Sequence, residues 1–183
     1  MIATGRLGVE IFAQNRMDQN CVLGLEYSGI DTKTGRRIMS MVVKGGIASY
    51  VEKHSRMIWE VPDHWSLKEA ATVPVVYITV YYAFFMCSDI RKGKTILIHA
   101  GTGGVGLAAI RTALAYNMDV FTTCSTPQKK KFLLETFPQL KGMNCFKLDN
   151  LGIFTIKHNF YFLIFRIPYW KFPRHFIRGY DTA

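Results

Sequence analysis

The sequence predicts an α/β protein in which a strand-rich region precedes a doubly wound parallel sheet. Three observations support this fold class. Short strand-like runs fill residues 22–62, the segment "ILIHAGTGGVGLAAI" (96–110) passes from a strand through glycines into a helix, and a further strand and helix follow. Strands that alternate with helices are typical of a parallel sheet. We therefore expect two regions that divide near residue 65.

The first region reads as strands separated by turn sequences. The runs are "VLGLEYSGI" (22–30), "RRIMSMVV" (36–43) and "IASYVEKHSRMIWEV" (47–61), with "DTKTG" and "KGG" between them. Polar and apolar residues mix there at nearly period two, which is typical of half-buried strands. Ser66 and Glu69 have the spacing of a capping box, which predicts a helix start. The apolar run at 75–87 predicts a buried helix.

The second region alternates strands and helices. It predicts a strand at 95–100, a helix to about residue 116, a strand at 119–125 and a helix at 127–136. Gly101, Gly103 and Gly106 fit the pattern G-x-G-x-x-G where the first strand passes into its helix, which is the context of a dinucleotide site. A turn that only packs closely is the alternative.

Each glycine of this pattern has an expected role. Gly101 would permit the tight turn, Gly103 would let backbone N–H groups approach a pyrophosphate, and Gly106 would pack the helix on the strand. Gly104 adds a fourth glycine. The N-terminus of the helix supplies free N–H donors and roughly half a positive charge.

The second strand of this unit indicates which dinucleotide is bound. It ends in "FTTCST" and lacks the acidic residue that bonds the ribose 2′-hydroxyl of NAD. Lys129, Lys130 and Lys131 follow in the opening turns of the next helix. Ammonium groups after a small polar strand end suit a 2′-phosphate, so the sequence favours NADPH; a solvated lysine run is the alternative.

Composition and charge exclude several other classes. The net charge is +10, but residues 151–183 hold five Lys or Arg against one acid, so the excess is not a nucleic-acid surface of the whole chain. The four cysteines stand far apart, which argues against a zinc site and a disulfide framework. No signal peptide and no membrane-spanning run is visible. We expect a cytoplasmic, soluble protein that binds no nucleic acid.

Several of these stretches carry a resemblance to a known family. The segments "WEVPDHWSLKEAATVPVVYITVYYAF", "KGKTILIHAGTGGVGLAAI" and "VFTTCSTPQKKKFLLETFPQL" resemble the enoyl reductase domain of animal fatty acid synthase. The openings "MIATGRL" and "LGLEYSGID" also look like this family, which is a zinc-free branch of the medium-chain dehydrogenase/reductase superfamily. The resemblance runs from Met1 to about Leu140.

The resemblance implies a fold, a reaction and partners. The fold would be a partial GroES-like β domain (1–65), then the first half of a Rossmann NADPH-binding domain (66–140). The reaction would be NADPH-dependent reduction of a trans-2-enoyl thioester on an acyl carrier, inside a multidomain homodimeric synthase of fatty acid biosynthesis. No metal is implied.

The resemblance also assigns cofactor-binding residues. The turn would hold the pyrophosphate, and Lys129 and Lys130 would meet the adenosine phosphate. Ser125 would also bind the cofactor, and Thr79 would lie near the nicotinamide. The turn comprises Gly101, Thr102, Gly103, Gly104, Val105 and Gly106.

The sequence departs from the family at both ends. Family members have a segment before Met1, and the expected second half of the Rossmann sheet is replaced after about residue 140 by "DNLGIFTIKHNFYFLIFRIPYWKFPRHFIRGYDTA". We interpret residues 141–183 as a divergent aromatic and basic tail, foreign to the fold. A genuine tail that lies on a membrane surface or stacks on single strands is the alternative. The chain is then expected to be a fragment that is inactive alone.

No catalytic residue is assigned from the sequence. Tyr77, Tyr81, Tyr82 and His99 could donate a proton, but the tyrosines are expected to be core aromatics and His99 a packed histidine. Two other functions stay open. They are a zinc-free quinone oxidoreductase-like reductase and a nucleotide-binding module without catalysis.

Overall fold

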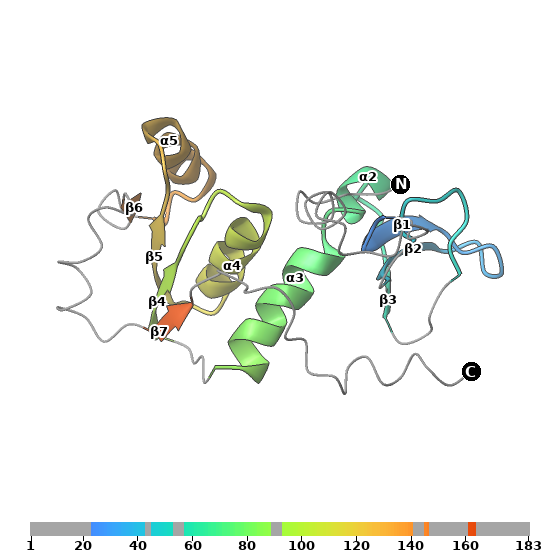
Figure 1. Cartoon of the computed structure of the whole chain (residues 1–183), viewed down its shortest axis with the longest axis horizontal. Coiled ribbons are helices and arrows are strands. Elements are labelled where there is room, and N and C mark those ends of the chain that lie inside the picture. Colours follow the sequence, from blue (N-terminus) through green and yellow to red (C-terminus); the bar gives the residue numbers. More distant parts are fainter. Residues whose placement is uncertain are drawn as a thin grey trace. The chain divides into compact units, whose positions relative to one another are not determined.

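The computed structural model describes residues 23–42, 45–52, 57–88, 93–140, 145–146 and 161–163. The chain divides into two compact units, Met1–Met86 and Cys87–Ala183, each with its own sheet (Figure 1). The opening "MIATGRL" and most of the tail lie outside the described residues. The helices after residue 65 group with the first unit, and the domain boundary near that residue stays a prediction.

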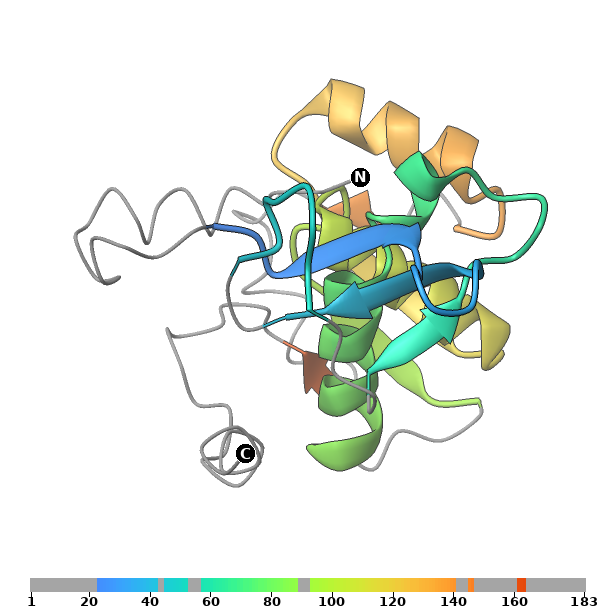
Figure 2. The ribbon, with the colours of Figure 1, turned by 90° about the vertical axis from the view of Figure 1, so that its right-hand side faces the viewer.

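The first unit contains an antiparallel sheet in the order β1–β2–β3. Its strands are β1 (Glu26–Ile30), β2 (Arg37–Met41) and β3 (Ile58–Glu60), and Figure 2 shows them side by side. The first two match the predicted runs. Only three residues at the end of the third run are in a strand.

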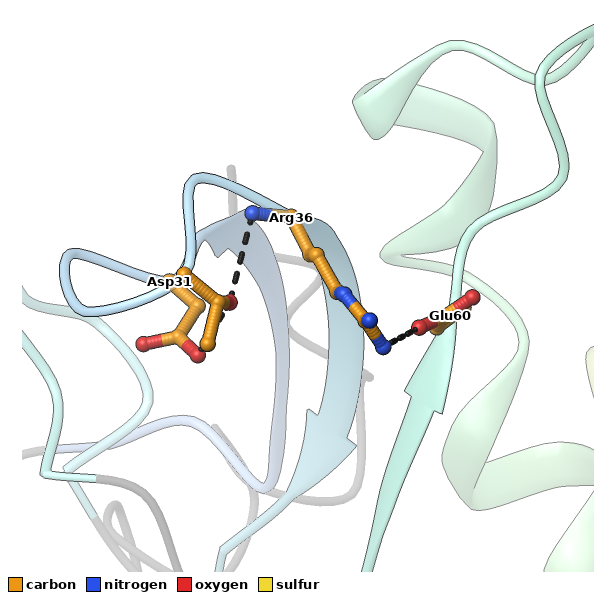
Figure 3. A network of polar contacts seen from close by, with 4 residues as sticks. Asp31, Arg36 and Glu60 are labelled. Carbon is orange, nitrogen blue, oxygen red and sulfur yellow. Dashed lines mark hydrogen bonds and ion pairs between the residues drawn. The ribbon is translucent and has the colours of Figure 1, made fainter.

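The turn between β1 and β2 is held by polar contacts. The Asp31 carboxylate accepts a hydrogen bond from the Thr34 hydroxyl at 2.7 Å, and Gly35 adopts a positive φ of 70°. The Arg36 guanidinium, which follows the turn, pairs with Glu60 on β3 at 2.5 Å (Figure 3). Both partners of this ion pair are exposed, so it contributes only about 0–1 kcal/mol.

Helix α2 (Leu67–Ala70) begins as the sequence predicts. The Ser66 hydroxyl accepts from the Glu69 N–H at 3.1 Å, and the Glu69 carboxylate accepts from the Ser66 N–H at 2.8 Å. These two bonds satisfy orphan donors at the helix start. The capping box is therefore confirmed.

Helix α3 (Pro74–Tyr81) continues into a π-helical turn, η1 (Tyr82–Met86). The prediction of a helix buried all round is wrong, because Tyr77, Tyr81 and Met86 are exposed while Val80 and Phe84 are fully buried. Helix α3 packs on β1 and β2. The expectation that the tyrosines are core aromatics is accordingly wrong for Tyr77 and Tyr81.

A buried carboxylate on β1 caps α3. The Val73 N-cap has no side-chain cap, and the Val75 N–H instead donates to the Glu26 carboxylate at 2.9 Å. Glu26 is buried, and this burial raises the pKa of its carboxyl above the ordinary value, although the bond from Val75 opposes the shift. Glu26 thus fastens the start of α3 to the sheet at a cost in desolvation.

Replacing Glu26 tests this cost. Because the folded-state pKa is raised, the folded protein holds this proton more tightly than the unfolded chain, and stability falls as pH rises from about 4.5 through the folded pKa. Glu26→Gln keeps an acceptor without the charge, so it should flatten that slope. Glu26→Ala leaves the N–H without its acceptor and should cost about 1–3 kcal/mol. Thermal unfolding between pH 4 and pH 8 measures both effects, and an unchanged slope in Glu26→Gln would contradict this role.

The second unit contains a parallel sheet in the order β6–β5–β4–β7. Its strands are β4 (Thr95–Ile98), β5 (Asp119–Thr123), β6 (Cys145–Phe146) and β7 (Tyr161–Leu163). Figure 1 shows helix α4 (Gly104–Ala115) beside β4 and β5, and α5 (Pro127–Thr136) after β5. The α/β fold class and the β-α-β-α order are confirmed. The fully buried side chains of this unit include Ile96, Ile98, Ile110 and Leu133.

Two strands lie where the sequence suggests none. Residues 145–146 pair with β5 and residues 161–163 pair with β4, both in parallel. These five residues of the segment 141–183 therefore take part in the sheet. Runs of two and three residues are too short to show a period, so the sequence pattern did not reveal them. Whether the tail is native to the fold stays a prediction.

Candidate functional site

The glycine turn connects β4 to α4 in the second unit. Ala100 adopts a positive φ of 54°, the Gly101 N–H donates to the Thr123 carbonyl at 3.0 Å, and the Gly103 N–H donates to the Ala100 carbonyl at 2.9 Å. Helix α4 then begins at Gly104. The turn is therefore held both to β5 and to itself.

The structure revises the reasons for two glycines. A Cβ on Gly101 would collide with the Thr122 hydroxyl on β5, so Gly101 serves close packing, and the positive φ falls on Ala100 instead. A Cβ on Gly106 would collide with the Ala100 carbonyl and with Gly101, so the first turn of α4 packs on the glycine turn rather than on the strand. Both positions require glycine to build the turn.

Gly103 differs from these two glycines. It is exposed, extended with φ −74° and ψ 161°, and a Cβ there would meet only the Ala100 carbonyl, at 3.3 Å. As N-cap of α4 it offers no side-chain acceptor. Neither the backbone conformation nor packing in the core requires glycine at this position. The absence of a side chain instead keeps the space in front of the helix open.

The first turn of α4 has free donors. None of the described residues accepts a hydrogen bond from the N–H groups of Gly104, Val105 or Gly106, and Gly103 provides no cap. Free N–H groups at the positive end of a helix dipole bind anions such as phosphate. The 12-residue helix α4 thus presents a candidate anion site next to Thr102.

Helix α5 brings a cation to the same side. Thr126 is its N-cap and accepts from the Lys129 N–H at 3.3 Å, while the Lys129 ammonium donates to the Ser125 hydroxyl at 2.9 Å. Both Ser125 and Lys129 are exposed. They place a hydroxyl and a positive charge at the carboxyl end of β5, where the sequence predicts the 2′-phosphate.

An open hollow of about 530 Å³ lies between the glycine turn and α5. Its walls are Ala100, Thr102, Gly103, Gln128, Lys129 and Phe132. The structure therefore brings together the turn and one of the predicted lysines. The sequence analysis does not name Gln128 and Phe132, although Phe132 shares a helix face with Lys129 three residues before it and with Gln128 four residues before it.

Lys130 does not line this hollow. It lies three residues before the buried Leu133, and its charge opposes the rise in the pKa of Cys145. Burial and the neighbouring Cys124 raise that pKa to about 12. The Sγ atoms of Cys124 and Cys145 lie 3.1 Å apart as free thiols, so cysteines distant in sequence are close in space. A part for Lys130 in phosphate binding stays a prediction.

The remaining candidates have structural contacts. His99 Nδ1 lies 3.1 Å from the Thr123 hydroxyl, and burial lowers the pKa of His99, which keeps its ring neutral at pH 7. This agrees with the expectation of a packed histidine. The Thr79 hydroxyl donates to the Val75 carbonyl at 2.7 Å within the first unit, and its place near a nicotinamide stays a prediction.

The described residues contain neither a metal-binding cluster nor a membrane-spanning helix. No group of three or more His, Cys, Asp or Glu side chains among them could hold a metal ion. No helix in the same part of the chain is long and apolar enough to span a bilayer.

Sequence comparison finds relatives among polyketide synthases. The chain is 36% identical over 123 residues to the highly reducing polyketide synthase tstA of Talaromyces stipitatus, which covers 63% of this chain and 5% of the synthase. It is 33% identical over 171 residues to the probable polyketide synthase 1 of Dictyostelium discoideum, with 86% of this chain and 5% of that protein covered. The chain thus spans a small part of these relatives. No family model matches it.

Solved structures share the fold. The quinone oxidoreductase of Thermus thermophilus, solved also with NADPH, aligns at a TM-score of 0.62 and 28% identity, with 69% of this chain and 42% of that one covered. The Escherichia coli quinone oxidoreductase complexed with NADPH gives 0.65 and 25%, with 73% and 45% covered. The CurK enoyl reductase gives 0.63 at 24% identity, with 77% and 44% covered. The chain therefore has the fold of quinone oxidoreductases and enoyl reductases of the medium-chain dehydrogenase/reductase superfamily.

Proposed function

We propose that the chain binds NADPH at the N-terminus of α4 and belongs to a reductase of the fatty acid or polyketide synthase type. The observation that carries this proposal is the set of N–H groups on Gly104, Val105 and Gly106 without an acceptor among the described residues, which follow directly on Gly103 in the wall of an open hollow that Lys129 also lines. The NADPH complexes among the structural neighbours support the choice of cofactor.

In this proposal the two ends of the hollow bind two phosphate groups. The pyrophosphate would accept from the free N–H groups after Gly103, and the 2′-phosphate would meet Ser125 and Lys129. Since the Lys129 ammonium already contacts the Ser125 hydroxyl, a 2′-phosphate would replace this neutral acceptor by an anionic one and so form a stronger bond. The end of β5 carries no carboxylate that would repel this phosphate.

The proposed reaction is reduction of a trans-2-enoyl thioester held on an acyl carrier. Bound NADPH supplies a hydride for the β-carbon, and a proton is added at the α-carbon. The residues of this chain would orient the cofactor. His99 is neutral and bonded to Thr123, so we assign it no proton transfer. The narrower form of this proposal is that the chain belongs to an animal-type fatty acid synthase, a multidomain homodimer. The polyketide synthase relatives support the broader form, a reductase of the fatty acid or polyketide synthase type.

A second candidate is reduction of quinones by a free-standing enzyme. The quinone oxidoreductases among the structural neighbours favour it. The two candidates differ in substrate, so NADPH oxidation by crotonyl thioester and by a simple benzoquinone would discriminate between them. Cofactor binding with neither activity would indicate a nucleotide-binding module.

The cofactor choice is tested by reversing one charge. Lys129→Glu should lower the affinity for NADPH by about ten-fold or more and the affinity for NADH by less than about three-fold, because only NADPH carries the 2′-phosphate. Lys131→Glu is the matched control, since Lys131 pairs with Glu135 along the helix. Lys130→Glu shows whether the neighbouring lysine contributes. Equal losses for the two cofactors in Lys129→Glu, measured by fluorescence titration, would refute the assignment.

A further inference from the structure

Helix α5 presents a mixed face to the hollow. Gln128, Lys129 and Phe132 line it together because residues three and four apart share a helix face. The charged group lies toward the start of the helix, beside Ser125, and the aromatic ring lies about one turn further on. The wall therefore combines an anion-binding end with an apolar end.

Phe132 is free to receive a ligand. Its side chain is 46% exposed, and among the described residues no ring contact involves it. The neighbouring Leu133 is fully buried, so another face of α5 lies in the core. The ring is thus held beside the hollow by a helix whose other face is fixed in the core.

We infer that Phe132 is a specificity-determining residue on which the adenine base of the dinucleotide stacks. This inference rests on the proposed function and extends it to the base. The adenosine joins the pyrophosphate to the 2′-phosphate, so it lies between the helix α4 donors and Lys129. A purine there needs a flat apolar partner, and among the described residues that line the hollow Phe132 is the one with an aromatic side chain. Stacking of a base on an aromatic ring uses the flat faces of the two rings and does not depend on the hydrogen-bonding edge of the base.

The test compares ligands with and without a base. Phe132→Ala should weaken NADPH and 2′,5′-ADP by about ten-fold, within the range measured for loss of a base stack. It should leave inorganic pyrophosphate binding unchanged, because pyrophosphate has no base. Phe132→Trp should restore nucleotide affinity, and Phe132→Leu should restore little of it because it lacks a ring face.

Tyr116→Ala is the matched control. Tyr116 is as exposed as Phe132, at 46%, but lies at the far end of α4, about 18 Å along that helix from the glycine turn. Its loss should not change any affinity. Circular dichroism checks that each variant is folded.

The outcomes separate this inference from the proposed function. Wild-type affinity for NADPH in Phe132→Ala would overturn the stacking role while leaving the cofactor site intact. An equal loss of affinity for pyrophosphate and for 2′,5′-ADP in Phe132→Ala would also overturn it, because the substitution would then affect binding of the phosphates and not of the base. No binding of NADPH by the wild-type chain would overturn the proposed function and this inference together.

Discussion

NADPH binding is expected to fall by at least about 100-fold when Gly103 is replaced by valine. The valine side chain would fill the space in front of α4 and cover the N–H groups of Gly104, Val105 and Gly106. Loss of two charge-assisted bonds at about 1.5 kcal/mol each gives an effect of this size. Fluorescence titration with NADPH measures it.

The fold should survive this change, which makes the result interpretable. Gly103 has an extended conformation that valine adopts, and an added Cβ would meet only one carbonyl, at 3.3 Å. Gly106→Val is the contrasting variant, because its Cβ would collide with the Ala100 carbonyl, and it should lower the melting temperature. Unchanged NADPH affinity in a folded Gly103→Val protein would mean that the turn is only structural.

The second large effect concerns catalysis by the chain alone, which should show no enoyl reductase turnover above background. The alignments cover 42% to 45% of the neighbouring quinone oxidoreductases and 44% of the CurK enoyl reductase. More than half of each of these chains is therefore unmatched. Among the described residues of the second unit, the one histidine is neutral and bonded to a threonine, so we assign it no proton transfer.

The measurement is NADPH oxidation with crotonyl and longer enoyl thioesters, using residues 1–183 as monodisperse protein. The same preparation should first be shown to bind NADPH, so that loss of folding is excluded. Turnover close to that of a complete enoyl reductase would contradict the prediction. It would require a proton donor within the chain, and Tyr77, Tyr81 and His99 would be the residues to replace first.

Local signals predicted the elements around the site. The capping box at Ser66 and the bounds of α5 follow from caps and periodicity, because these depend on residues within one helical turn. The glycine turn was placed correctly between β4 and α4 for the same reason. The pattern G-x-G-x-x-G also predicted the free N–H donors, because it places a helix start at this position and the first N–H groups of a helix have no acceptor within it.

Contacts between distant residues were not predictable from local pattern. The need for glycine at Gly101 arises from Thr122 on the next strand, and the closeness of Cys124 and Cys145 arises from the pairing of β5 with β6. The exposure of Tyr81 depends on how little of α3 the small sheet covers. These features depend on tertiary packing, which local sequence propensity does not describe.

The different positions of Lys129 and Lys130 on α5 could have been predicted from the sequence. Helical residues three apart share a face, so Lys129 lies on the face of Phe132 and Lys130 on the face of Leu133. Leu133 and Phe137 are buried and mark the core side of α5, with Lys130 three residues before Leu133. Periodicity applied to this helix would have separated the two lysines and drawn attention to Phe132.

The central claim is that NADPH binds at the start of α4, and an amide ¹H–¹⁵N spectrum titrated with NADPH tests it most directly. We expect the largest shifts at the amides of Thr102 to Gly106, a second group around Ser125 to Lys129, and a smaller response of both groups to NADH. Shifts confined to the first unit, or a spectrum unchanged at saturating NADPH, would contradict the assignment.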